Sequence, residues 1–153
     1  MKVYNLKKVQ HLPISLDEAW DFFSSPANLK DITPEHMKFD IRYLSGGNKM
    51  YPGQMITYRL QPVPGVPVSW TTEITHVQEP NYFVDEQRFG PYAMWHHQHH
   101  FKEVEGGVEM TDEVNYAIPL GPLGRLANWL FVERQVKAIF DHRYKVLEQR
   151  FSS

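Results

Sequence analysis

Hydrophobic and polar positions alternate through the middle of the chain, from Met37 to Ile118. Alternation with a period of two is typical of strands that bury one face. Turn-forming segments rich in Gly, Pro and Asn interrupt it about every ten residues, and each marks the end of a strand. Six strands fit between and around the breaks, which fall at residues 45–48, 62–67, 79–81, 90–91 and 105–107.

Two short helices are expected between these strands and an earlier strand at residues 3–12. Ser15 and Glu18 form a capping box, the pattern that opens a helix. The pair Ser25-Pro26 has the serine and the proline that favour a second helix start. Thr33-Pro34 ends this second helix, so it must be short.

A long helix is predicted from Gly121 to about Arg150. Hydrophobic residues recur along it at steps of three and four, which gives one apolar stripe along its whole length. The stripe consists of Leu126, Trp129, Val136, Phe140, Tyr144, Leu147 and Phe151. Glu133 falls at the centre of the stripe, which predicts a carboxylate that faces the interior.

The elements therefore follow the order strand, two short helices, six antiparallel strands and a long C-terminal helix. The economical way to bury these faces is a curved antiparallel sheet wrapped around the long helix. The predicted fold class is α+β, with a seven-stranded antiparallel sheet. No repeat, linker or low-complexity segment divides the chain, so one domain is expected over residues 1–153.

One predicted strand pair and the turn before the last helix carry recognisable motifs. These are Phe83 to Tyr92, then Trp95, His97, His99 and Phe101, and finally Pro119 to Gly124. Together with the element order, they resemble a bacterial branch of the START / polyketide cyclase–dehydrase (SRPBCC) superfamily, the birch-pollen-allergen-like proteins. The resemblance covers nearly the whole chain and implies a helix-grip fold with a hydrophobic cavity between sheet and helix. It leaves the activity open, because the superfamily includes carriers, receptors and enzymes.

Composition excludes several classes of function. Sixteen Lys and Arg against eighteen Asp and Glu give a net charge of −2, with no basic stripe for nucleic-acid phosphates. The absence of cysteine excludes disulfides, thiolate metal sites and a cysteine nucleophile, and it favours a cytoplasmic location. No window approaches the roughly 18 apolar residues of a membrane span, so stable membrane insertion is not expected.

Alternation also assigns a direction to each side chain of residues 93–104. The odd positions hold two large aromatic residues, which makes them the better candidate for the core face. His97 and His99 share these positions and are expected to point inward. His96 and His100 occupy even positions and are expected to face solvent.

Acidic and amide side chains are expected to join the two histidines inside. Asp85 and Gln87 lie on the face of two phenylalanines in the preceding strand, and Asp112 lies among the apolar positions of the last strand. With Glu133 from the helix stripe, they form an inward polar set. Such groups are costly inside an aromatic interior unless they are paired or hydrogen-bonded.

Three interpretations of this polar set stay open. In the first, the acids and histidines satisfy one another and only stabilise the interior. In the second, several of them orient the polar end of a ligand in a solvated pocket. In the third, His97 and His99 chelate a metal ion, because their Cα atoms lie roughly 6.6–7 Å apart on one side of the strand. Asp85, Asp112 or Glu133 would complete such a site. No motif requires a cofactor.

Covalent catalysis has little support in the sequence. There is no cysteine, no serine in a Gly-x-Ser-x-Gly turn and no Gly-rich phosphate loop. General acid–base chemistry needs only a histidine near a carboxylate in an apolar cavity. The resemblance to polyketide cyclases and dehydrases implies a cyclisation or dehydration as the alternative activity. His97 or His99 is the candidate base, and Asp112 is a further catalytic candidate.

The sequence favours the binding of a small hydrophobic organic molecule, lipid- or polyketide-like, in the internal cavity. The residues expected to line that cavity or to form its polar end are Trp20, Tyr58, Trp70, Asp85, Gln87, Trp95, His97, His99, Phe101, Asp112, Tyr116, Trp129, Glu133, Val136 and Phe140. The segment Leu126–Val132 is apolar around most of its circumference. It either packs on neighbouring loops or forms a homodimer contact, a membrane-touching portal or a gate over the cavity.

Overall fold

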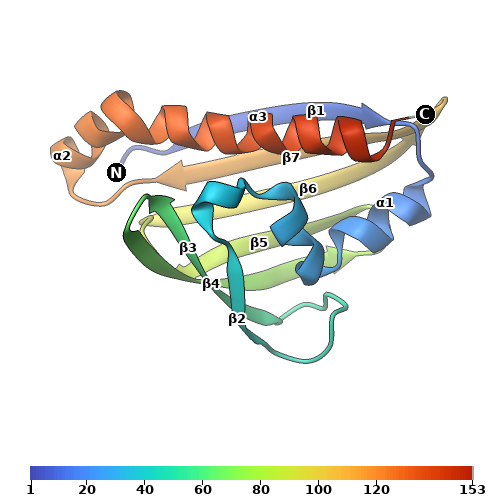
Figure 1. The fold of residues 1–153 in the computed structure, drawn as a ribbon, viewed down its shortest axis with the longest axis horizontal. Helices are drawn as coiled ribbons and strands as arrows, with labels where there is room; N and C mark the ends of the chain where they lie inside the picture. Colours follow the sequence, from blue (N-terminus) through green and yellow to red (C-terminus); the bar gives the residue numbers. More distant parts are fainter. Residues whose placement is uncertain (153) are drawn as a thin grey trace.

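The alternating segments form one seven-stranded antiparallel sheet in the computed structural model, which describes residues 1–152 (Figure 1). The strand order is β1-β7-β6-β5-β4-β3-β2, so β1 pairs with β7 and the other strands pair with their neighbours along the chain. The strands are β1 Tyr4–Leu12, β2 Asp40–Leu44, β3 Met55–Val63, β4 Val66–Gln78, β5 Tyr82–Phe89, β6 Met94–Val104 and β7 Gly107–Ala117.

The helices lie in the two predicted places. After β1 come the α-helix α1 and two tighter 3₁₀ helices, η1 and η2, and after β7 come three consecutive segments, α2, η3 and α3. Their bounds are α1 Leu16–Phe23, η1 Pro26–Ile32, η2 Glu35–Met37, α2 Gly121–Ala127, η3 Asn128–Val132 and α3 Glu133–Arg150. The predicted α+β class and helix-grip arrangement are confirmed. None of the helices within residues 1–152 is both long and apolar enough to cross a membrane.

The two predicted helix starts differ in how they are capped. At α1, the backbone N–H of Glu18 donates to Ser15 Oγ over 3.1 Å, as the capping box requires. Ser25 does not cap η1, because its hydroxyl donates to the carbonyl oxygen of Asp21 in the preceding helix. The prediction of a capping serine at the second start is therefore wrong.

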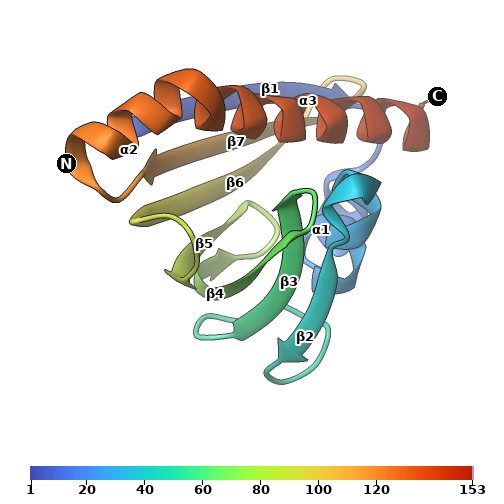
Figure 2. The same ribbon diagram turned by 60° about the vertical axis from the view of Figure 1, so that its left-hand side comes forward.

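The concave face of the sheet is enclosed from two sides. The C-terminal helix lies along β1 and β7, and the rest of the sheet curves away below it (Figures 1 and 2). Lys8 of β1 forms an ion pair with Asp141, and Gln10 donates to the carbonyl oxygen of Tyr144. These bonds hold α3 on the edge strand. On the other side, α1 packs on β6 and η1 packs on α3.

The C-terminal helix contains one turn of π-helix, η3, which accommodates one more residue than an α-helical turn. After this turn the buried face carries Val136 and Phe140, as the apolar stripe predicts. Before it, the extra residue moves the buried face back by one position, to Gly124 and Asn128. The helix therefore presents a different side to the sheet than unbroken α-helical spacing predicts.

The predictions that Trp129 and Glu133 face the interior are consequently wrong. Trp129 is 74% exposed, and Glu133 is exposed as well. Unbroken α-helical spacing through residues 128–132 predicts that both residues lie on the apolar stripe. The extra residue of the π turn accounts for Trp129, whereas Glu133 is the first residue of α3 and its exposed side chain lies beside the face that carries Val136 and Phe140, not on it.

Candidate functional site

A cavity of about 330 Å³ lies inside the curve of the sheet. Its wall is formed by strands β2 to β6 on one side, by η1 and η2 on another, and by η3 and α3 above. Most of the lining side chains are aliphatic or aromatic. Polar side chains also reach the cavity, and the charged ones are Asp85, Arg143 and the histidines His97 and His99 when these are protonated.

Alternation places the two histidines as predicted. His97 and His99 are two residues apart on β6, both are buried, and their rings stack with centroids 3.6 Å apart. The ring of His99 also stacks on Phe83, at 4.0 Å between centroids. This column of rings fixes where the imidazole nitrogens point.

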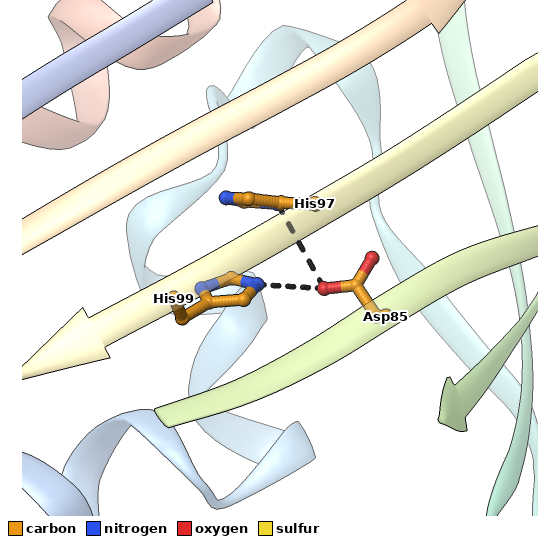
Figure 3. A group of neighbouring side chains, drawn as sticks. All are labelled: Asp85, His97 and His99. Carbon is orange, nitrogen blue, oxygen red and sulfur yellow. Dashed lines mark hydrogen bonds and ion pairs between the residues drawn. The ribbon is translucent and has the colours of Figure 1, made fainter. Parts of the chain in front are cut away.

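Each imidazole is hydrogen-bonded to a different carboxylate. His99 Nε2 lies 2.6 Å from Asp85 Oδ2, and His97 Nε2 lies 2.8 Å from Asp112 Oδ1. Asp85 comes from the adjacent strand β5, where it lies beside the two histidines (Figure 3). An ionised carboxylate only accepts hydrogen bonds, so both Nε2 atoms donate.

Two longer approaches place these pairs next to each other in one cluster without a hydrogen bond, and His99 Nδ1 is buried with no hydrogen-bond partner among the described residues. His97 Nδ1 lies 3.8 Å from Asp85 Oδ2, and His99 Nδ1 lies 3.4 Å from Asp112 Oδ1. Arg143 of α3 extends the cluster, with its guanidinium 3.5 Å from Asp112 Oδ1. A chain of polar groups thus runs from α3 through Asp112 and the histidines to Asp85 in the cavity wall.

Burial and neighbouring charges set the protonation of this cluster. Burial lowers the pKa of His99 to about 4, and the nearby charge of His97 acts in the same direction, so His99 is neutral at pH 7. Burial alone would raise the pKa of Asp112. The Arg143 guanidinium and the hydrogen bond from His97 outweigh it and hold that pKa well below its usual range.

Asp85 is also ionised at neutral pH. Burial opposes its ionisation, but the hydrogen bond from His99 and the positive charges nearby bring its pKa below the ordinary value. All its contacts within the cluster use Oδ2. Oδ1 takes part in none of them, and the carboxylate lines the cavity, so one acceptor oxygen is left for a ligand.

Trp70 and Tyr58 add two neutral polar groups. Within residues 1–152, Trp70 Nε1 is a buried donor with no acceptor, and the ring lines the cavity. Burial and the negative charge of Asp85 raise the pKa of Tyr58, so its hydroxyl stays protonated. An unpaired buried donor is unfavourable, and an acceptor on a ligand would satisfy it.

The geometry of the cluster is that of a hydrogen-bonded group rather than that of a metal site. Donor atoms of Asp85, His97 and His99 all lie within 4.8 Å of one another, the spacing of a three-ligand site. However, two ligands of one tetrahedral zinc ion lie roughly 3.3 Å apart, and the Asp85–His99 contact is shorter, at 2.6 Å. A shared ion would have to break the hydrogen bonds that organise the cluster.

Seven of the fifteen residues predicted for the ligand site line the cavity. They are Tyr58, Trp70, Asp85, Trp95, His97, His99 and Phe140. Asp112 lies behind the histidines, where it orients them. Val136 and Tyr116 are buried but pack beside the cavity, and the Tyr116 hydroxyl donates to Asn128 Oδ1.

The structure places Trp20, Phe101 and Gln87 away from the cavity wall, which corrects their predicted position. Trp20 packs edge-on against Phe101 in the solid core below α1. The Gln87 amide closes the β5–β6 turn, because it donates to the carbonyl of Tyr92 over 2.7 Å and accepts from its N–H over 3.0 Å. Its side chain points to the predicted side of the strand, but the turn takes up both of its polar atoms.

Arg143 is the charged cavity-lining residue that the sequence did not predict. It lies three residues after Phe140 and four before Leu147, so the helical period alone placed it on the buried stripe. Arginine is seldom buried without a partner, and Asp112 is that partner. The pairing of Arg143 with Asp112 could be predicted only with knowledge that α3 packs on β7.

No protein-family model matches the sequence, and no curated protein matches it either. Solved structures do match. A protein from Thermus thermophilus gives a TM-score of 0.70 at 15% identity, over 98% of this chain and 100% of that one. Ara h 8.0201 gives a TM-score of 0.66 at 14% identity, over 98% of each chain. A point mutant of Thalictrum norcoclaurine synthase, solved with a transition-state analogue, gives 0.69 at 12% identity, over 99% of this chain and 98% of that one.

These likenesses show that the chain shares the fold of these proteins, as the resemblance seen in the sequence implied. They include an enzyme, and the sequence identities are 12 to 15%. At that distance the shared fold carries no information about activity, and function has to be argued from the cavity and its polar groups.

Proposed function

We propose that this protein binds a small, largely apolar organic molecule in the cavity, with hydrogen bonds to Asp85 and Trp70. The observation that carries the proposal is the cavity. Its volume of about 330 Å³ falls within the range of small-molecule sites, roughly 300–1,000 Å³. A mostly apolar wall with a few fixed polar groups is also the usual composition of such sites.

The two unused polar atoms describe the ligand further. Asp85 Oδ1 can accept a hydrogen bond from a donor on the ligand, and Trp70 Nε1 can donate one to an acceptor. Asp85 pairs with Ile74 on β4, four residues from Trp70, which is about 13 Å along the strand. A ligand that meets both groups therefore carries a donor and an acceptor at separate positions.

The first experiment is native mass spectrometry of protein purified without a nickel column, compared with its denatured mass. An organic adduct that leaves on denaturation supports the proposal and identifies the ligand class. The second experiment titrates the protein with 1-aminoanthracene, a fluorescent apolar amine that can donate to Asp85. Saturable uptake with an emission shift is expected.

Asp85→Asn tests the polar contact in that titration. A hydrogen bond to a charged group contributes about 1.5–3 kcal/mol, so 1-aminoanthracene affinity should fall roughly 10- to 100-fold. Glu86→Gln is the matched control, because Glu86 is the next residue of β5 and its carboxylate bonds to His96 outside the cavity. Absence of saturable binding, or equal binding by both variants, contradicts the proposal.

Acid–base catalysis is the second candidate, and one observation favours it. Asp85 is an ionised carboxylate in an apolar cavity, and a neutral histidine is bonded to it. Such a pair can remove a proton from a carbon next to a carbonyl group and deliver it elsewhere on the molecule. In this geometry Asp85, rather than His97 or His99, presents the base to the ligand, because both Nε2 atoms donate to carboxylates and the Nδ1 atoms of His97 and His99 lie beside Asp85 and Asp112.

Deuterium exchange tests this second candidate without knowledge of the natural substrate. Acetoacetyl-N-acetylcysteamine in D₂O should exchange the hydrogens between its carbonyl groups faster with the protein than without it. Asp85→Asn should lower the catalysed rate by about 10²- to 10⁴-fold, the usual contribution of a general base. Exchange at the buffer rate rejects catalysis of this type and leaves the binding proposal standing.

A further inference from the structure

Large apolar side chains cover the outer surface of α2 and η3. Leu120, just before α2, and five residues within these two segments are exposed. We refer to these six residues as the α2–η3 patch: Leu120, Leu123, Leu126, Trp129, Leu130 and Phe131. A contiguous exposed apolar surface of this kind marks an interaction site more often than an accident of composition.

The interior fixes this orientation of the helix. On the buried side, a Cβ atom on Gly124 would lie 2.1 Å from the carbonyl oxygen of Pro119, so only glycine fits there. Asn128 is buried and accepts a hydrogen bond of 2.9 Å from the Tyr116 hydroxyl. With Asn128 bonded to β7 and Gly124 against the backbone that follows β7, the apolar residues of the patch have to face outward. They are not core residues that a small rotation would bury.

The patch borders the opening of the cavity. Among the residues that line the cavity, Val63, Pro91 and Phe131 are exposed, so the cavity wall reaches the surface at these residues. Gln135 donates to the carbonyl of Pro62 over 2.6 Å, which ties the β3–β4 turn to the helix beside this opening. Phe131 belongs both to the patch and to the cavity wall.

The segment that carries the patch has a net positive charge, although the whole protein carries −2. Residues 119–137 contain Arg125, Arg134 and Lys137 against one acid, Glu133, which gives a local charge of +2. All four side chains are exposed. Lys2 adds a further cation, since it lies with Arg125 along one surface groove.

We propose that the α2–η3 patch docks on an anionic lipid bilayer and places the cavity opening at the membrane surface. Leucines with an exposed tryptophan, flanked by arginine and lysine, are the composition of helices that lie in a membrane interface. A second copy of this chain fits less well. A symmetric contact would bring Arg125, Arg134 and Lys137 of both copies together, and like charges oppose such contacts. Docking is distinct from insertion, for which no described helix is suited.

The test is flotation of the full chain with vesicles. Binding is expected to vesicles of phosphatidylcholine mixed with phosphatidylglycerol, and weak or no binding to phosphatidylcholine alone. Trp129 is far more exposed than Trp20, Trp70 or Trp95, so contact with lipid should shift the tryptophan emission to the blue. The double variant Trp129→Ser/Leu130→Ser should lose most of the binding and the shift. Lys137→Gln should weaken binding about fivefold, the factor that one basic residue near an anionic surface contributes.

Tyr43→Ser is the matched control, because Tyr43 is also an exposed aromatic residue but lies on β2, away from the patch. It should bind vesicles as the unmodified chain does. The thermal unfolding midpoint of the double variant should be unchanged, since both replaced side chains are exposed. The proposal is overturned if the protein fails to float with anionic vesicles. It is also overturned if the double variant floats as well as the unmodified chain. Dimerisation in solution that the double variant abolishes, without vesicle binding, would assign the patch to a second copy instead.

Discussion

The two ends of the interior contain the same kinds of side chain but are packed differently. At one end, Trp20 meets Phe83 and Phe101 edge-on, with ring centroids 5.9 and 5.8 Å away, and the space is filled. At the other end, Trp70 stacks on Tyr58 at 5.9 Å, and the cavity lies beside them. An excess of aromatic residues therefore does not by itself decide whether an interior is solid or hollow.

The elements that cover the sheet make the difference. The helix α1 lies over the first end and inserts Trp20 and Phe23 into it. The second end lies below η3 and the start of α3, where the π turn directs Trp129 and Leu130 outward. The side chains large enough to fill that end therefore face solvent, and the space between sheet and helix stays open.

Replacement of the tryptophans is expected to separate the two ends most clearly. Trp20→Ala removes a side chain that is packed on all sides, so it should lower the free energy of unfolding by about 3–5 kcal/mol. Trp70→Ala should cost less, because one face of the ring already borders the cavity and loses no contacts there. Urea unfolding of both variants measures the difference. Equal losses would mean that the cavity end is as tightly packed as the other.

A smaller effect should follow from the charged cluster, which lies on the cavity side. The ordinary histidine pKa is 6.5, whereas that of His99 in the folded protein is about 4. As pH falls from 6.5 toward 4, the unfolded chain takes up a proton that native His99 does not bind, so stability decreases. The pKa values of Asp85 and Asp112 are also lowered, from an ordinary value of 3.8. Stability therefore continues to decrease below pH 3.8, where these carboxylates take up protons in the unfolded chain first.

His99→Gln should reduce this pH dependence. The variant is expected to be less stable at pH 7, because Asp85 loses its hydrogen-bond partner, but to lose less additional stability between pH 7 and pH 5. His100→Gln is the control, since His100 is the adjacent residue and is exposed. It should follow the unmodified protein. Parallel pH curves for all three proteins would show that His99 does not titrate as its burial implies.

The sheet and much of the polar cluster were predictable because strand alternation is a local property. Each side chain of β6 is directed by its position in the strand, so His97 and His99 face inward wherever the strand pairs. Asp112 follows from the same rule on β7, and its register opposite His99 brings the two together. Gln87 shows the limit of the rule. Alternation predicts the face of the strand on which its side chain lies, but not that its amide closes the β5–β6 turn.

The helix was less predictable, because its relation to the sheet depends on contacts across the fold. With a single extra residue at residues 128–132, Gly124 and Asn128 lie on the buried face in place of Leu126 and Trp129. No local sequence pattern predicts the π turn at residues 128–132. It is stabilised by the close approach of Gly124 to the Pro119 backbone and by the bond from Tyr116 to Asn128, both of which exist only in the folded chain.

The sequence by itself determined the strands, their inward faces and the order that makes a sheet curve around a final helix, because these depend on periodicity and on short-range turn chemistry. Only the tertiary structure decided the rotation of that helix, the pairing of Arg143 with Asp112 and the place of the cavity. Each of these depends on which surfaces meet across the interior, and the volume left between two packed surfaces is a property of both together.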